Sequence, residues 1–193
     1  MRRRSGPSAG DEIDDLVRLA AQGDGPAFSA LIQRHDRQLR ALSYHVLGDR
    51  EAMDDVLQDA YLKAFRALPE FRGESALGTW LYRVVYNACL DELRRSKHRE
   101  RVLSLSEAPE RHRPPPGDPR EQVEHASVVR DALKALSPEE RAAVWLVDAV
   151  GLSYHVAAEA LGIREGTLAS RLNRARAALR ERLADLVGQG ASR

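Results

Sequence analysis

The stretch GLSYHVAAEALGIREGTLASRLNRARAALRERL, residues 151–183, organises the second half of the chain. It predicts a short helix, a glycine turn and a longer helix. Ser153 is placed to cap the first helix, because the first N–H groups of a helix have no partner within it. Gly162 is placed to end that helix in the left-handed conformation. Beyond the turn, leucine and alanine recur at helical spacing and predict a buried stripe over Leu168, Leu172, Ala175, Leu179 and Leu183.

The opposite side of the longer helix carries polar and cationic side chains, namely Thr167, Ser170, Arg171 and Arg174. A helix, a tight turn and a second helix with such an outer face form a helix-turn-helix motif, whose second helix enters the major groove of DNA. Arginine in that position pairs with phosphates or with guanine edges. On these residues alone, an ordinary helical hairpin with a solvated arginine face is the alternative.

The composition favours helices and restricts the function. Of the 193 residues, 31% are charged and 5% are aromatic, and the formal net charge is +1, so any surface that binds nucleic acid must be local. The single cysteine, Cys89, excludes an internal disulfide framework and a cysteine-rich zinc site, and we expect it to be a small, mostly buried residue. No apolar run approaches the ~18 residues of a membrane span. No hydrophobic segment follows the basic Met1–Arg4, so we expect a soluble, cytoplasmic protein without a secretory signal.

Breaks in the apolar periodicity divide the chain into two small helical domains. We expect a disordered tail over residues 1–10, a first domain over 11–97, a flexible proline-rich linker over 98–120, a second domain over 121–187 and a short tail over 188–193. The linker stands out because prolines are frequent in it and apolar periodicity is absent.

Glycine, proline and capping residues mark the ends of the predicted helices. In the first domain, helices are expected at residues 11–22, 26–48, 50–68 and 77–95. In the second domain, one helix is expected over 120–136, and the next begins at the capping box of Ser137 and Glu140. No strand candidate is longer than a few residues. The predicted fold class is therefore all-α, with a four-helix domain and a helix-turn-helix domain joined by an extended linker.

The helix expected over residues 50–68 has a second stripe beside its core residues, formed by Asp55, Gln58, Asp59 and Leu62. A solvated face rarely mixes an acidic cluster with a leucine, so we interpret this stripe as a docking face for a basic partner. A plain solvated face is one alternative. A catalytic or metal-binding pair of Asp55 and Asp59 is another, but the sequence supplies no further ligand, and Lys63 is placed as a simple ion-pair partner of Asp59.

The helix expected over residues 77–95 places Trp80, Arg83 and Asn87 on one stripe. Unstacked bases are bound by an aromatic face, a cation for the phosphate and an amide for the base edge. The stripe therefore predicts contact with single-stranded nucleic acid. A core tryptophan beside a solvated arginine is an equally simple interpretation.

Together these segments resemble the extracytoplasmic-function (ECF, group IV) sigma factors of the sigma-70 family, over about residues 24–186. The helix-turn-helix alone would be a weak signal, because many regulators share it. The specific feature is an ordered combination: DDVLQDAYLKAFRAL, then FRGESALGTWLYRVVYNACLDELRR, a proline-rich linker and GTLASRLNRARAALRERL. Within the family, NACLDELRR resembles actinobacterial sigma-M-like members.

The resemblance implies an alternative sigma factor that directs core RNA polymerase to specific promoters, recognises the −35 and −10 elements and nucleates melting of the duplex. Binding to the β′ clamp of the polymerase is implied for Asp55, Leu57, Gln58, Asp59 and Leu62. Binding to the −10 element is implied for Phe71, Arg72, Ser75, Thr79, Trp80, Arg83 and Asn87. Binding to the −35 element is implied for Thr167, Ser170, Arg171, Arg174 and Arg176.

The resemblance also implies the partners and excludes an enzyme. The expected partners are core RNA polymerase, through its β′ clamp and β flap, promoter DNA and an anti-sigma factor, without direct membrane contact. We expect no cofactor, no metal site and no catalytic residue, because no phosphate-binding loop, nucleophile–base pair or metal cluster is found in the sequence. A stand-alone helix-turn-helix regulator is the alternative function, but it has no need of the acidic stripe or the tryptophan helix.

Three residues depart from the family's usual pattern in the second domain. Ala169 stands where many members have a basic residue, which predicts an unusual −35 preference. His155 replaces an acid in the first turn of the short helix. Arg164 occupies the expected cap position of the recognition helix, where a hydroxyl is usual, and a DNA phosphate is a candidate substitute for the missing cap.

Overall fold

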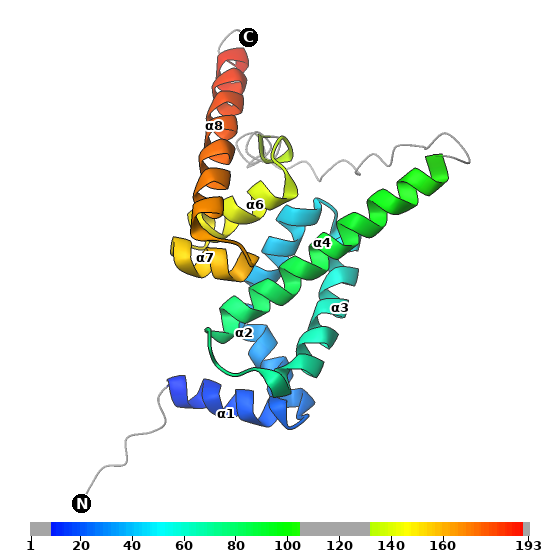
Figure 1. Cartoon of the computed structure of the whole chain (residues 1–193), viewed down its shortest axis with the longest axis vertical. Helices are drawn as coiled ribbons and strands as arrows, with labels where there is room; N and C mark the ends of the chain where they lie inside the picture. Colours follow the sequence, from blue (N-terminus) through cyan, green and yellow to red (C-terminus); the bar gives the residue numbers. More distant parts are fainter. Residues whose placement is uncertain (1–8, 105–131, 191–193) are drawn as a thin grey trace, which may run out of the picture.

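A computed structural model describes residues 9–104 and 132–190, and every element in this part of the chain is helical (Figure 1). The first domain consists of α1 (Ala9–Ala21), α2 (Gly25–Leu47), α3 (Arg50–Ala67), the short 3-10 helix η1 (Leu68–Glu70) and α4 (Leu77–Ser104). The second consists of α6 (Pro138–Val144), the π-helical turn η2 (Trp145–Ala149), α7 (Tyr154–Leu161) and α8 (Glu165–Gly190). The all-α prediction of two small helical domains is confirmed.

Side-chain caps fix the helix starts in the first domain. The carboxylate of Asp24 accepts the N–H of Ala27 at 2.8 Å before α2, and that of Asp49 accepts the N–H of Ala52 at 2.8 Å before α3. Each cap satisfies an N–H group that has no partner within the helix. Between them, Gly48 ends α2 with a φ of 76°, a conformation that costs little only for glycine.

The caps predicted for the second domain are confirmed. Ser137 and Glu140 form a reciprocal capping box at the start of α6, with distances of 3.2 Å and 3.0 Å. The hydroxyl of Ser153 accepts the N–H of Val156 at the start of α7. Gly162 ends α7 with a φ of 65°. These local signals set the short first helix, the turn and the long second helix of the motif.

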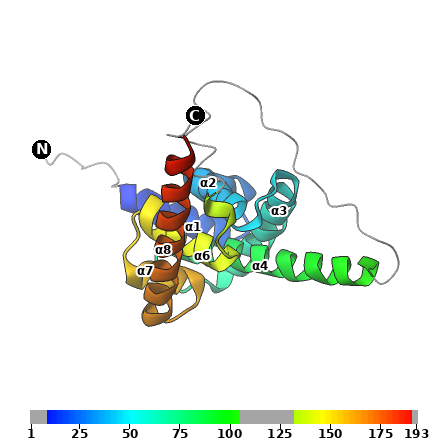
Figure 2. The same cartoon turned by 90° about the horizontal axis from the view of Figure 1, so that it is seen from above.

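The fourth helix is longer than predicted, and its far end projects beyond the helical body (Figure 2). The linker was expected from residue 98, but α4 continues to Ser104. Ion pairs of Glu92 with Arg95 and Arg99 stabilise the extra turns, and the first proline after them is Pro109. The prediction placed the boundary too early because it took the loss of apolar periodicity as the end of the helix.

The first helix begins earlier, and the last helix ends later, than the sequence predicted. The first helix already includes Ala9, and α8 continues to Gly190, so both expected tails are shorter than predicted. Of the helix expected over residues 120–136, only 132–134 lie in a described helical turn. Residues 120–131 of that helix, the remainder of the linker, and residues 1–8 and 191–193 lie outside the described residues.

The core is continuous through both domains. In the first domain it is built around Leu39, Leu42 and Val46 of α2 and their neighbours on α3 and α4. In the second, the predicted stripe residues Leu168, Leu172 and Ala175 are fully buried. One cluster of buried side chains joins these two groups, because α4 packs against α7 and α2 packs against α6. The two domains therefore lie directly against each other.

No helix in the described residues is long and apolar enough to cross a lipid bilayer.

Cys89 is buried in this core, as expected, and we predict that it is unreactive in the native protein. Its thiol lies 3.4 Å from the Ser43 hydroxyl, and burial raises its pKa to about 11. At pH 8 only about one thiol in a thousand would then be ionised. A chromogenic disulfide reagent at pH 8 should release less than a tenth of one equivalent in native buffer and one equivalent in guanidinium. Rapid native reaction would contradict the burial.

Candidate functional site

The stripe on α3 is an exposed acidic face with an apolar residue at one end. Asp55, Gln58 and Asp59 are exposed, and half of the Leu62 surface remains accessible to solvent. Leu62 therefore places apolar surface beside the two carboxylates, on the same face of the helix. Asp55, Gln58 and Asp59 share a shallow polar hollow with Glu92 and Arg95 of α4. The arrangement suits a basic partner that also presents an apolar side chain.

Two details of this face differ from expectation. Leu57 is 1% exposed and belongs to the core, so its side chain cannot contact a partner. Its position one residue from Gln58 turns it to the other side of the helix. Among the described residues, neither Asp55 nor Asp59 has an ion-pair partner, so the pair expected between Asp59 and Lys63 is not formed. No group of three acidic, histidine or cysteine side chains in the described residues is arranged to hold a metal ion.

The stripe on α4 presents a pair of aromatic rings at the junction with the preceding loop. The rings of Phe71 and Trp80 lie 5.3 Å apart, tilted by 48°, and both side chains are half-buried. Arg72 in the loop and Asn87 on the helix are exposed, and Ser75 is partly exposed. Thr79 is 5% exposed, so it lies inside the fold and not on this surface. The remaining side chains offer aromatic surface, an amide and cations, as a site for unstacked bases requires.

Arg83, in the middle of this stripe, is bound to the other domain. Its Nε and Nη2 atoms donate to the carbonyl oxygen of Glu159 at 3.0 Å and 2.8 Å. Its Nη2 atom also lies 3.6 Å from the Glu159 carboxylate. Glu159 is in the last turn of α7, where the helix dipole favours a cation, and its carbonyl oxygen also accepts the N–H of Gly162 at 3.1 Å. No sequence signal predicted this contact, which joins residues 76 positions apart.

Some side chains on the outer face of α8 are exposed, and others are bound to neighbouring elements of the protein. Thr167 and Ser170 are exposed, and the Ser170 hydroxyl donates to the Thr167 carbonyl oxygen at 2.9 Å. Arg174 is exposed, with its Nε atom 3.5 Å from the Glu140 carboxylate of α6. The predicted positions on this face therefore lie together, as helical spacing required.

Arg171 turns inward from the same helix toward the first domain. Its guanidinium lies near Tyr86 of α4. Burial raises the pKa of this tyrosine, and the nearby cation partly offsets that effect. One guanidinium nitrogen, Nη1, is buried without a hydrogen-bond partner in the described residues. Arg171 is therefore only partly exposed, whereas Arg174 on the same helix is exposed.

Arg176 holds the helix-turn-helix together. Its Nη2 and Nε atoms donate to the two carboxylate oxygens of Asp148 at 2.6 Å and 3.2 Å, and its Nη1 atom donates to the Tyr154 hydroxyl at 3.1 Å. The Asp148 hydrogen bond raises the pKa of Arg176 above its ordinary value. A bidentate arginine–carboxylate pair fixes orientation as well as distance. Arg176 therefore positions α8 against η2 and the start of α7.

The unusual His155 and Arg164 lie at the turn of the motif. The Nδ1 atom of His155 is 2.9 Å from a carboxylate oxygen of Glu165, which links the starts of α7 and α8. Arg164 precedes α8, as predicted, and its carbonyl oxygen accepts the N–H groups of Thr167 and Leu168. Both side chains are exposed.

Comparison with known proteins identifies the family. Residues 31–99 match the family described as Sigma-70 region 2, and residues 127–179 match Sigma-70, region 4. The chain is 45% identical over 179 residues to the ECF RNA polymerase sigma factor SigM of Mycobacterium tuberculosis, covering 92% of this chain and 86% of that protein. This chain belongs to the ECF sigma factors. The resemblance to sigma-M-like members is confirmed by the same comparison.

More distant sigma factors share the length and the fold of this one. The ECF RNA polymerase sigma-E factor of Escherichia coli K12 is 32% identical over 184 residues, covering 89% of this chain and 94% of that protein. The structure of CnrH in complex with the cytosolic domain of CnrY matches with a TM-score of 0.66 and 27% identity, over 91% of this chain and 99% of that one. RpoE of Bartonella quintana, in complex with the anti-sigma factor NepR, matches with a TM-score of 0.63 and 29% identity, over 81% and 96%.

We predict that the Asp148–Arg176 pair stabilises the second domain of this sigma factor. Because both side chains are about one-third exposed, Asp148→Ala should lower the free energy of unfolding by about 1 kcal/mol. The double variant with Asp148→Ala and Arg176→Ala should lose little more free energy of unfolding than either single variant. Denaturant unfolding measures these losses. Asp14→Ala, which removes an exposed acid of α1, is the control and should have no effect. Additive losses in the double variant would show that the two side chains do not interact.

Proposed function

We propose that this sigma factor brings core RNA polymerase to specific promoters through three surfaces of its own. The α3 face, formed by Asp55, Gln58, Asp59 and Leu62, binds the β′ clamp. The loop–α4 surface around Phe71 and Trp80 captures the −10 element as a single strand. The outer face of α8 reads the −35 element, and the second domain also contacts the β flap. The protein acts in the cytoplasm, where polymerase and promoters are found.

The exposed α3 face is the observation that supports this proposal over a stand-alone regulator. Among the described residues, Asp55 and Asp59 have no ion-pair partner, and Leu62 is the most exposed of the large apolar side chains. A protein that only binds DNA gains nothing from an acidic, partly apolar face, because phosphates repel carboxylates. A protein partner with basic and apolar side chains fits it.

Melting at the −10 element is assigned to the aromatic pair. Trp80 and Phe71 offer partly exposed stacking surface. Arg72 follows Phe71 in the loop and is proposed to bind phosphate, and Asn87, two helical turns after Trp80, is proposed to bind a base edge. Stacking on an aromatic ring contributes about 1–3 kcal/mol per base, which offsets the cost of taking a base out of the duplex. Thr79 is left out of this surface because it is buried.

An anti-sigma factor is a further proposed partner. CnrH and RpoE, which share the fold of this chain, were solved in complex with the cytosolic domain of CnrY and with the anti-sigma factor NepR. The similarity supports a partner of the same kind for this protein.

We predict that Asp59→Arg abolishes binding to core RNA polymerase without unfolding the protein. The exposed carboxylate makes no hydrogen bond or ion pair in the described residues, so its loss leaves the fold intact, while the new cation repels a basic partner. Co-purification with tagged core polymerase and circular dichroism are the measurements. Asp14→Arg makes the same charge change on α1 and should bind as the wild type does. Equal binding of core polymerase by both variants would contradict the assignment of the α3 face as the polymerase-binding surface.

For the −35 element, we predict that Arg174→Ala reduces the salt dependence of promoter binding by the polymerase complex. Each lost phosphate contact lowers the slope of log K against log salt by about one unit. Arg180→Ala removes the same charge from α8, farther along the helix, and serves as the control. The assignment of Arg174 fails if its slope equals that of the wild type, or if Arg180→Ala changes the slope equally.

A further inference from the structure

A histidine ring interrupts the apolar face of α2. Leu31, one turn before His35, and Leu39, one turn after it, are fully buried, so His35 lies on the same face of the helix. The side chain of His35 is itself half-buried. Burial, and then the nearby Arg34 cation, lower the pKa of His35. The ring is therefore neutral at physiological pH and packs as an aromatic side chain.

Gly78, the second residue of α4, lies directly against this ring. A Cβ atom added to Gly78 would lie 3.0 Å from Cε1 and 3.4 Å from Nδ1 of His35. Carbon atoms in contact are usually about 3.5–4.0 Å apart, so a methyl group at Gly78 would force the ring or the start of α4 to move. Gly166, the second residue of α8, differs in this respect, because a Cβ atom there meets no atom of the described residues within 4 Å.

The first turn of α4 is the part that would shift. The ring of His35 has little room along α2, because the buried Leu31 and Leu39 flank it. Helix α4 begins at Leu77, directly after an irregular loop, so its first turn can move without disturbing a preceding helix. Close-packed interiors pass such displacements on to their neighbours.

Trp80 belongs to this first turn. Its N–H donates to the Ala76 carbonyl oxygen at 3.1 Å, and its ring lies 5.3 Å from the ring of Phe71. The Trp80 side chain also packs against the core of the first domain. A displacement at Gly78 is therefore passed to Trp80 within one helical turn. Binding groups have to be held within about 0.5 Å of their productive position, so even a small displacement matters.

We propose that the contact of His35 with Gly78 sets the position of Trp80, which makes both of them positioning residues for capture of the −10 element. They act through the backbone of α4 and need no contact with DNA. Glycine is required at residue 78 because the His35 ring occupies the space of a side chain there. The inference rests on the proposed role of Trp80 in binding the −10 element, whereas the contact itself does not.

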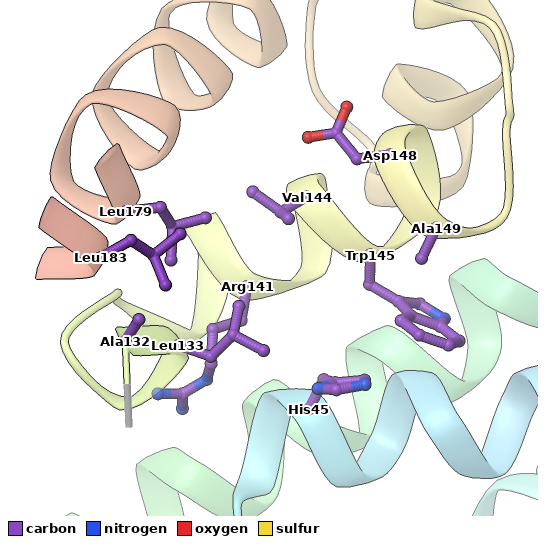
Figure 3. A pocket seen from close by; sticks show the side chains of 10 residues that line it. All are labelled: His45, Ala132, Leu133, Arg141, Val144, Trp145, Asp148, Ala149, Leu179 and Leu183. Carbon is purple, nitrogen blue, oxygen red and sulfur yellow. The ribbon is translucent and has the colours of Figure 1, made fainter. Parts of the chain in front are cut away.

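Fluorescence of Trp80 tests the positioning without DNA. The second tryptophan, Trp145, lies beside His45 near the C-terminal end of α2, with the two rings 4.5 Å apart (Figure 3). Trp145→Phe keeps an aromatic ring there and leaves Trp80 as the only tryptophan, so this variant is the parent. In the parent, Gly78→Ala should shift the Trp80 emission to longer wavelength and raise its quenching by acrylamide, because a displaced ring loses packing.

Two further variants separate the contact from a general effect of the substitution. Gly166→Ala makes the same change at the matched position of α8 and should leave the Trp80 emission at the parent value. In a His35→Ala background, Gly78→Ala should cause no change in emission or quenching, because the methyl group no longer meets a ring. A change that matters only while its neighbour is present is the mark of a direct contact.

Binding of a −10 strand tests the consequence for function. Core polymerase is assembled with each variant and titrated with a labelled single-stranded oligonucleotide, which carries the −10 non-template strand of a promoter that the wild type transcribes. Gly78→Ala should weaken this binding at least about fivefold, and only while His35 is present. Its binding to core polymerase and to a duplex with the −35 element alone should equal that of the wild type. Gly166→Ala should bind the −10 strand as the wild type does, because that strand has no −35 element.

Each contrary result has a separate meaning. Trp80 emission and quenching that Gly78→Ala leaves unchanged would overturn the positioning. A changed emission with unchanged binding of the −10 strand would overturn the role in capture. If Gly78→Ala loses its helix content by circular dichroism, recovery of the helices on adding His35→Ala supports the contact, and failure to recover overturns it. A wild-type polymerase complex that binds no −10 strand would contradict the proposed function and leave the fluorescence result standing.

Discussion

The contact between the two domains depends on two arginines, each of which caps the C-terminal end of a helix in the other domain. Arg83 of α4 binds a carbonyl oxygen in the last turn of α7, and Arg141 of α6 binds one in the last turn of α2. Both carbonyl groups lie at the C-terminal end of a helix, where the helix dipole is favourable for a cation, although the Glu159 carbonyl oxygen also accepts the N–H of Gly162. A guanidinium group has several N–H donors, so it can form hydrogen bonds with the carbonyl groups at a helix end without close packing around it.

A contact of this kind holds two domains together, and its carbonyl acceptor can be replaced by another acceptor. In the proposed function, a phosphate group would offer Arg83 an acceptor with a full charge in place of a partial one, so DNA would compete with Glu159 for this side chain. The exposed acidic face on α3 is on a different part of the molecule and takes no part in the exchange. Under the proposed assignments, polymerase docking and promoter binding use separate surfaces of this small protein.

Local sequence signals predicted the helices and their caps well, because a cap depends on residues three or four apart. Ser137, Ser153 and Gly162 behave as their types require. The family and its function were also accessible, because ordered motifs in both halves carry them. The end of α4 was misjudged, since ion pairs of Glu92 continue a helix beyond its apolar stripe. Leu57 and Thr79 lie in predicted binding segments but on the buried sides of their helices.

The sequence could not reveal which arginines are bound to other parts of the protein. Arg83, Arg171 and Arg176 look alike as exposed cations on helical faces, yet their partners lie between 22 and 85 positions away in the chain. Only the packing of the domains brings those partners together. Arg176, an implied contact with the −35 element, is a side chain that fixes the helix-turn-helix, and Arg83 and Arg171 are parts of a domain contact.

The central claim is that the protein confers promoter specificity on core RNA polymerase. Multi-round transcription of a pool of genomic promoters, by purified core polymerase with and without the protein, tests it most directly. The account predicts discrete transcripts that appear only with the protein and share −35 and −10 elements. Absence of such transcripts, together with absence of binding to core polymerase, would contradict the account and favour a regulator that acts alone.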